Sequence, residues 1–87
     1  MVKEVYKINW QDSCTSYHEW VLMEDLDTEI TTIKMTSYGV MVNENAESVT
    51  IAQNYGENPS QICNLMTIPR GCITVIEIID RIDIEQE

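Results

Sequence analysis

The aromatic residues of this chain and one isolated base are its best candidates for chemistry, and that chemistry is ligand binding. The aromatics are two Trp and four Tyr, and Phe is absent. A Trp or Tyr ring can stack on a ligand while its N–H or O–H forms a hydrogen bond. Trp10 and Trp20 are therefore binding candidates, although either could instead complete a thin core. Arg70, the only base between Lys34 and Arg81, could hold a phosphate or a carboxylate, or could pair with a surface acid.

Catalytic and metal-binding groups are sparse. Cys14 and His18 would share one face of a helix, as a nucleophile and its base can. No third group is evident beside them, and one Cys–His pair falls short of the four ligands of a structural zinc site. The acidic run of Glu24, Asp25 and Asp27 is typical of a solvated face. Glycine-rich phosphate-binding motifs are absent. We therefore expect no enzyme activity, no metal and no cofactor.

The charge of the chain excludes two classes of partner. Fifteen acids against five bases give a net charge of −10. A protein that binds nucleic-acid backbones needs clustered Lys and Arg, and so does one that binds an anionic membrane. The acidic excess lies in two blocks, residues 19–29 and 77–87, and the chain between them is close to neutral. We expect neither direct nucleic-acid binding nor membrane binding.

Length and cysteine content favour one small cytoplasmic domain. The 87 residues allow a single domain with a thin core, in which the acidic tail 80–87 extends the last strand or frays. No apolar run approaches the roughly 20 residues of a membrane span, and the N-terminus has no apolar stretch of signal-peptide length. The three cysteines lack a C-x-x-C spacing, which fits reduced thiols.

Alternation of apolar and polar residues predicts five strands that position these candidates. The strands cover residues 2–10, 30–42, 48–55, 63–68 and 73–79. Residues 15–27 form either a short helix, which Ser16 and Glu19 would cap, or an extended segment. Pro69 and Gly71 predict a tight turn before the last strand, at the place where SH3-like and Sm-like barrels have a one-turn helix. That strand is apolar on both faces, so we expect it to be well buried, either at the centre of the sheet or at an interface between subunits.

Five short strands in so small a chain predict a mainly β fold. We expect a small five-stranded antiparallel barrel of the SH3-like (Sm-like) kind, with one short helix or long loop after the first strand. Asp12 and Ser13 follow Trp10 at the end of the first strand, while Ser37 and Gly39 lie on the apolar face of the second. A Gly inside a strand often marks a bulge or a close approach by another group.

The order of the short motifs resembles a group of small proteins carried by bacteriophages and prophages. That group has a W-x-D-S start, a second Trp, an S-x-G hairpin and an I-P-[KR]-x-x-I ending. The corresponding residues here are 10–13, Trp20, 37–39 and 68–73, so the resemblance spans about residues 5–79. The resemblance implies a phage accessory protein that acts in the bacterial cytoplasm by binding a molecule of the host.

Two hypotheses about function follow from that resemblance. The first is a counter-defence sponge, a homo-oligomer that sequesters a nucleotide-type immune signal such as a cyclic ADP-ribose or a cyclic dinucleotide. A Trp would stack the base, Arg70 would face a phosphate, and Asp12 or Ser13 would take ribose hydroxyls or base amines. The predicted ligand-binding residues are Trp10, Asp12, Ser13, Trp20, Ser37, Gly39 and Arg70.

The second hypothesis uses the charge directly. Residues 19–29 and 77–87 would imitate nucleic-acid phosphates and occupy a basic channel of a host defence protein, as anti-CRISPR and anti-restriction inhibitors do. Acidic blocks also raise solubility, which is their plainer interpretation.

Overall fold

The backbone of the protein is mainly extended. The computed structural model describes residues 2–13, 19–26, 31–57 and 60–83. Within these ranges lie five strands and two single turns of 3-10 helix. The elements are β1 (Val2–Asp12), η1 (Met23–Asp25), β2 (Ile33–Glu44), β3 (Ser48–Glu57), β4 (Ser60–Pro69), η2 (Arg70–Cys72) and β5 (Ile73–Asp83).

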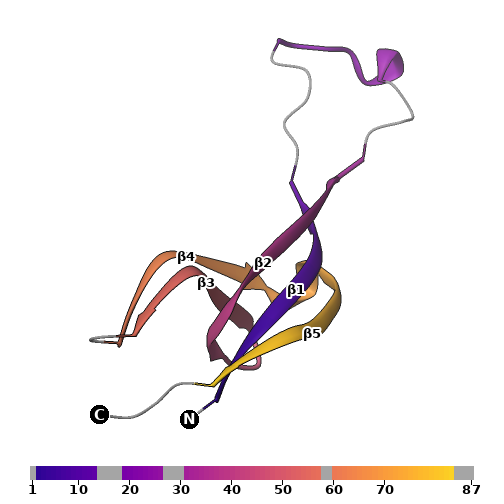
Figure 1. Cartoon of the computed structure of the whole chain (residues 1–87). Helices are drawn as coiled ribbons and strands as arrows, with labels where there is room; N and C mark the ends of the chain where they lie inside the picture. Colours follow the sequence, from indigo (N-terminus) through magenta and orange to yellow (C-terminus); the bar gives the residue numbers. More distant parts are fainter. Residues whose placement is uncertain (1, 14–18, 27–30, 58–59, 84–87) are drawn as a thin grey trace.

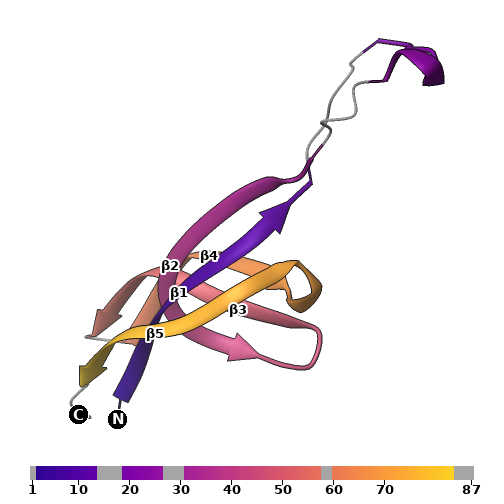
Figure 2. The same ribbon diagram turned by 90° about the vertical axis from the view of Figure 1, so that its right-hand side faces the viewer.

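The five strands form one antiparallel sheet in the order β4-β3-β2-β1-β5 (Figures 1 and 2). This confirms the prediction of a mainly β fold with five antiparallel strands. The one-turn helix expected at Pro69 to Cys72 is also present, as η2. The sheet is open, because no backbone ladder joins β4 to β5 among the described residues.

Four of the strands extend further than the sequence pattern predicted. Pairing continues to Val2 with Asp83 at one end of the β1–β5 ladder, and to Glu57 with Ser60 at the tip of the β3–β4 hairpin. Backbone hydrogen bonds do not depend on side-chain alternation, so a ladder can continue past the last alternating residue. The β2–β3 turn is held by Asn45, whose Oδ1 accepts from the backbone N–H groups of Glu47 (2.8 Å) and Ser48 (2.9 Å).

β2 pairs with two different strands along its length. Its first part pairs with β1, from Ile33 opposite Asp12 to Val40 opposite Val5. Its second part pairs with β3, from Val40 opposite Ala52 to Glu44 opposite Val49. β3 therefore approaches β2 beside Gly39, where the pairing passes from β1 to β3.

A thin core lies on the face of the sheet to which Ile8 points. Ile8, Val49, Ile51 and Ile68 are the buried members of this cluster. Partly buried hydrophobic residues pack around them, including Trp10, Met66 and Cys72.

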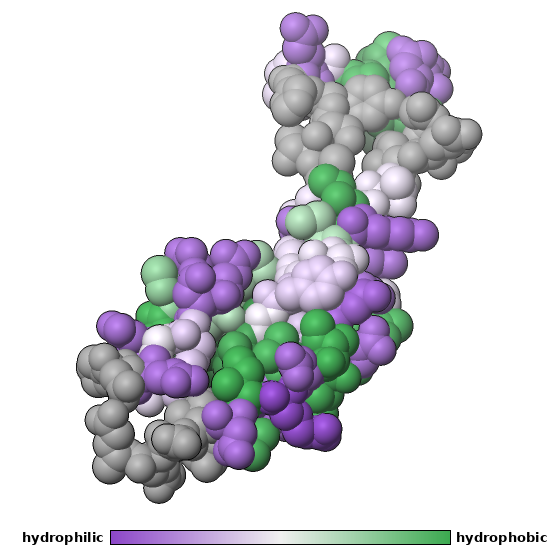
Figure 3. Space-filling view, viewed as in Figure 1, coloured by the Kyte–Doolittle hydropathy of each residue, from purple (hydrophilic) through white to green (hydrophobic). Residues whose placement is uncertain are grey.

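The expectation that β5 is well buried is wrong for a single copy of the chain. β5 lies at the edge of the sheet and pairs only with β1. Its Val75, Ile76, Ile78 and Ile79 side chains are 37–49% exposed. Apolar surface accordingly gathers over the part of the sheet where β1 and β5 lie side by side (Figures 1 and 3). An apolar strand is well buried only when something covers both of its faces, and among the described residues β5 has one neighbouring strand and exposed apolar side chains.

The segment 19–26 lies beyond the ends of β1 and β2 and away from the rest of the sheet (Figures 1 and 2). Its helical part is the single turn η1, while residues 19–22 are neither helix nor strand and Leu22 has an extended backbone. The cap predicted at Ser16 lies outside the described residues. Within the described part of the chain, no helix is both long and apolar enough to cross a membrane.

Candidate functional site

Trp10 lies on the core face of the sheet, where its side chain forms a hydrogen bond and packs on buried residues. Its indole Nε1 donates to Ser37 Oγ at 3.0 Å, and Ser37 Oγ in turn donates to Met66 Sδ at 3.5 Å. The ring packs against the core cluster. The structure therefore brings together two residues predicted for the ligand site, Trp10 and Ser37, and links them through a hydrogen bond that supports the fold.

Gly39 makes room for the protein's own backbone. A Cβ atom placed on Gly39 would lie 2.8 Å from the carbonyl oxygen of Ala52 and 3.0 Å from Cβ of Ile51. The close approach predicted from a Gly inside a strand is present, but β3 makes it. The space beside Gly39 that we assigned to a ligand is thus taken by the chain itself.

Arg70 forms hydrogen bonds and an ion pair with residues at the turn between β2 and β3. Its Nε donates to the carbonyl oxygen of Asn45, and its Nη2 lies 3.5 Å from Oε2 of Glu44. Its backbone N–H donates to the carbonyl oxygen of Glu47 at 2.9 Å. The sequence left open whether Arg70 binds a ligand or pairs with a surface acid. In the structure Arg70 pairs with a surface acid, Glu44.

The remaining predicted site residues lie at or beyond the end of β1. Asp12 Oδ1 accepts from the backbone N–H of Ser13 at 2.8 Å, so this carboxylate is engaged locally. Trp20 lies in the segment 19–26 and is fully exposed. Asp12, Ser13 and Trp20 are absent from the linings of three cavities that the described residues form.

A different set of residues forms a polar groove over β1 and β2, which we call the Lys34 groove. Its volume is about 460 Å³, and it is lined by Asn9, Trp10, Gln11, Lys34, Met35, Thr36 and Thr74. Among the predicted site residues, only Trp10 lines it. The volume falls within the roughly 300–1,000 Å³ of small-molecule sites.

Hydrogen bonds hold several side chains of the groove in place. Thr36 Oγ1 donates to Asn9 Oδ1 at 3.1 Å, across the β1–β2 ladder. Thr74 Oγ1 donates to the backbone carbonyl of Asn9 at 3.1 Å, from β5. At the edge of the groove, Thr32 Oγ1 donates to Gln11 Oε1 at 3.4 Å. The groove therefore presents hydroxyl and amide groups on three adjacent strands, in positions fixed before any ligand arrives.

Lys34 is the group that sequence reasoning missed. Lys7, Arg70 and Arg81 each lie within ion-pair distance of a Glu, at 3.8, 3.5 and 3.4 Å. Over the described ranges, Lys34 and Lys3 have no such carboxylate, although the chain has three times as many acids as bases. These two unpaired lysines line two different cavities. No sequence signal separates them from the paired bases, because the partners of Lys7 and Arg81 lie about 70 residues away in the chain.

Tyr6 is the one described group whose pKa is clearly shifted. Burial raises the pKa of the Tyr6 hydroxyl, and the charges of Glu4 and Glu44 and a hydrogen bond to Glu4 raise it further. The phenol is therefore uncharged at neutral pH. It supplies no general base or anionic ligand there.

Cys14 and His18, which we considered as a catalytic pair and as zinc ligands, lie outside the described residues. Across residues 2–13, 19–26, 31–57 and 60–83, no group of three or more His, Cys, Asp or Glu side chains could hold a metal ion. Cys63 and Cys72 are free thiols.

Comparison of the chain with protein-family models, with curated proteins and with solved structures gives no match.

Proposed function

We propose that this protein is a non-catalytic binding protein that sequesters an anionic, nucleotide-type ligand in the Lys34 groove. The observation that carries the proposal is an unpaired Lys in a polar groove of about 460 Å³. Lys34 is exposed and has no ion pair among the described residues. An ammonium without a carboxylate partner is available to a phosphate of a ligand.

The other groups of the groove match the rest of a nucleotide. The Asn9 and Gln11 amides can both donate and accept, which suits the edge of a base. The Thr36 and Thr74 hydroxyls each donate their one proton to Asn9, which leaves their oxygens free to accept from ribose hydroxyls. Trp10 supports the groove from the core face, where its ring packs on the buried cluster and its N–H stays with Ser37. In this arrangement Lys34 takes the role that the sequence assigned to Arg70.

The net charge of −10 opposes this ligand only at long range. Exposed charges more than about 8 Å apart are largely screened at physiological salt, so distant acids contribute less than Lys34 at contact. Local cations and N–H donors decide the potential inside a groove.

The phage resemblance supplies the biological setting of the proposal. A small β-sheet protein can act against a defence system by lowering the free concentration of its signal. The signals we propose are cyclic ADP-ribose and cyclic dinucleotides, bound in the bacterial cytoplasm. Sequestration needs the protein in excess over its ligand, but it needs no turnover.

A thermal-shift panel tests this proposal. At a ligand concentration 100 times the Kd, binding stabilises the folded state by about 2.7 kcal/mol. For a domain of this size that corresponds to a Tm increase of about 10–20 °C. We expect a shift with a cyclic nucleotide signal, and none with uncharged nucleosides or with inorganic phosphate alone at the same concentration.

Two matched variants assign the shift to the groove. Lys34→Gln should weaken binding about tenfold or more, because it removes the charge that faces the phosphate. Lys7→Gln removes the same charge from a residue that pairs with Glu77, and should leave the affinity within twofold of the wild type. No shift with any nucleotide, or equal losses in both variants, would contradict the proposal.

An acidic protein inhibitor is a second candidate function, and the exposure of one acidic block favours it. Glu19, Glu24 and Asp25 are all exposed on the segment 19–26, which extends away from the sheet (Figure 1). Such a projecting acidic segment could enter a basic channel of a host defence protein. Neutralising Glu24, Asp25 and Asp27 together should then abolish binding to a basic nuclease, measured by titration calorimetry. Unchanged affinity in that variant would remove this acidic segment from consideration.

A further inference from the structure

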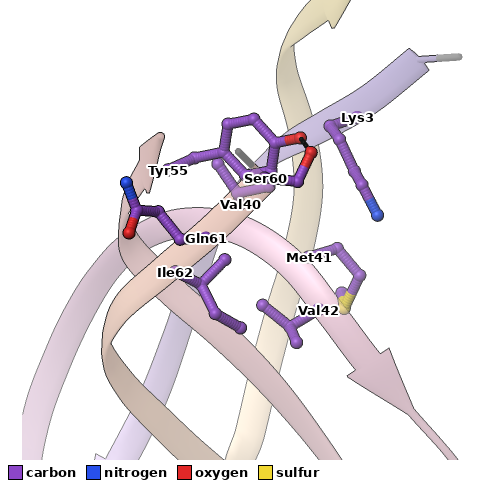
Figure 4. Close-up of a pocket in the computed structure, with 8 residues that line it drawn as sticks. All are labelled: Lys3, Val40, Met41, Val42, Tyr55, Ser60, Gln61 and Ile62. Carbon is purple, nitrogen blue, oxygen red and sulfur yellow. Dashed lines mark hydrogen bonds between the residues drawn. The ribbon is translucent and has the colours of Figure 1, made fainter. Parts of the chain in front are cut away.

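A second cavity lies toward the start of β1, and we call it the Lys3 cavity (Figure 4). Its volume is about 230 Å³, and its walls include the apolar side chains of Val40, Val42 and Ile62. Its polar groups include the Lys3 ammonium and the hydroxyls of Tyr55 and Ser60, which are hydrogen-bonded to each other at 3.0 Å. Lys3 has no ion pair among the described residues.

The size and chemistry of this cavity suit one large side chain better than a metabolite. Its volume is below the roughly 300 Å³ at which small-molecule sites usually begin. An apolar wall beside an unpaired ammonium matches an aromatic or aliphatic anchor with a carboxylate next to it. The complementary surface is therefore a short apolar peptide segment flanked by acids.

This chain itself presents such a segment. Trp20 is 104% exposed, Leu22 65% and Met23 84%. The neighbouring Glu19 and Glu24 are exposed as well. Adjacent large apolar side chains this accessible mark an interaction site.

The anchor and the cavity lie toward opposite ends of the molecule. β1 runs from the Lys3 cavity to Asp12, after which the chain leads to the segment 19–26. Nine residues of strand from Lys3 to Asp12 cover about 30 Å. The segment points away from the sheet in both views (Figures 1 and 2), so the accessible cavity is that of another copy.

We propose that Trp20 of one copy enters the Lys3 cavity of a second copy, where Glu19 or Glu24 pairs with Lys3. The contact joins two different surfaces, so it is head-to-tail and propagates until a ring closes. Each copy carries a charge of −10, so salt should strengthen the association by screening the net repulsion. The proposal is independent of ligand binding in the Lys34 groove.

Complementation between two variants tests the proposal by sedimentation velocity. Trp20→Ala removes the anchor and leaves the cavity intact, whereas Val42→Trp fills the cavity and leaves the anchor intact. Val42 is 37% exposed and lines the cavity, so a larger side chain at this position can extend into the cavity without displacing the core. We expect the wild type to associate, each variant alone to remain at the monomer mass of 10.0 kDa, and an equimolar mixture to form a species of twice that mass and nothing larger.

Charge variants give a second readout that does not depend on filling the cavity. Lys3→Glu should weaken self-association about tenfold, and Lys3→Arg should largely preserve it. A wild type that stays monomeric at millimolar concentration would overturn the proposal, and so would a mixture of folded variants that stays monomeric. Association that Trp20→Ala leaves intact would place the contact elsewhere, such as on the exposed edge of β5.

Discussion

Replacing Gly39 by Ala should lower the free energy of unfolding by about 1–3 kcal/mol, as overpacking of a closed interior does. The added Cβ would meet the Ala52 carbonyl oxygen at 2.8 Å and Ile51 Cβ at 3.0 Å. The obstructing atoms belong to the backbone and to the Cβ of a buried residue, so they cannot rotate aside. Relief requires β2 and β3 to separate next to the core cluster, and a branched residue such as Val at position 39 should cost more than Ala.

Gly71→Ala is the matched control for this prediction. A Cβ on Gly71 would have no atom within 4 Å, and its backbone lacks a positive φ. Urea denaturation of both variants should therefore separate them, with Gly71→Ala within about 0.5 kcal/mol of the wild type. Equal stability of the two variants would contradict the close approach of β3 to Gly39.

Truncating Trp10 to Ala should lower the free energy of unfolding by about 3–5 kcal/mol, the range for removing a large aromatic side chain from a core. The loss has two sources. The indole ring packs against the buried cluster, and its Nε1 donates to Ser37. For a domain with so few buried side chains, this is a large share of a typical stability of about 5–15 kcal/mol.

Trp10→Phe separates the two sources of that loss. Phe keeps an aromatic ring but lacks the indole N–H, so the hydrogen bond to Ser37 Oγ is lost. We expect a cost of about 1–2 kcal/mol from the missing hydrogen bond and the smaller ring. Chemical denaturation of both variants measures the difference. A cost below about 1 kcal/mol for Trp10→Ala would show instead that the ring contributes little to the core and is free to stack on a ligand.

Local signals in the sequence were sufficient to predict the sheet. β-branched and apolar alternation located all five strands, and Pro69 followed by Gly71 located the turn at which η2 forms. The position of β5 was not predictable in the same way. Its apolar residues on both faces indicated burial, but the strand order places it at an edge. Which strands become edges depends on pairing between segments far apart in the chain.

The candidate site was less predictable than the strands, because it depends on which Lys and Arg side chains form ion pairs with carboxylates. Arg70 was an attractive phosphate ligand as an isolated base, yet its guanidinium reaches Asn45, 25 residues earlier in the chain. Lys34 had no distinguishing neighbour in the sequence. It is available because no carboxylate of the described residues lies within ion-pair distance of it, whereas Lys7, Arg70 and Arg81 each have one. Such pairings are set by the register of the sheet, and composition does not specify them.

An amide-resolved NMR titration with a cyclic nucleotide signal tests the Lys34 groove most directly, because it reports where a ligand binds as well as whether it binds. We predict chemical-shift changes that saturate and concentrate at residues 9–11 and 34–36 and at Thr74, and that are much reduced in Lys34→Gln but retained in Lys7→Gln. Saturable changes centred on other residues, or no change with any nucleotide at millimolar concentration, would contradict a nucleotide site in this groove.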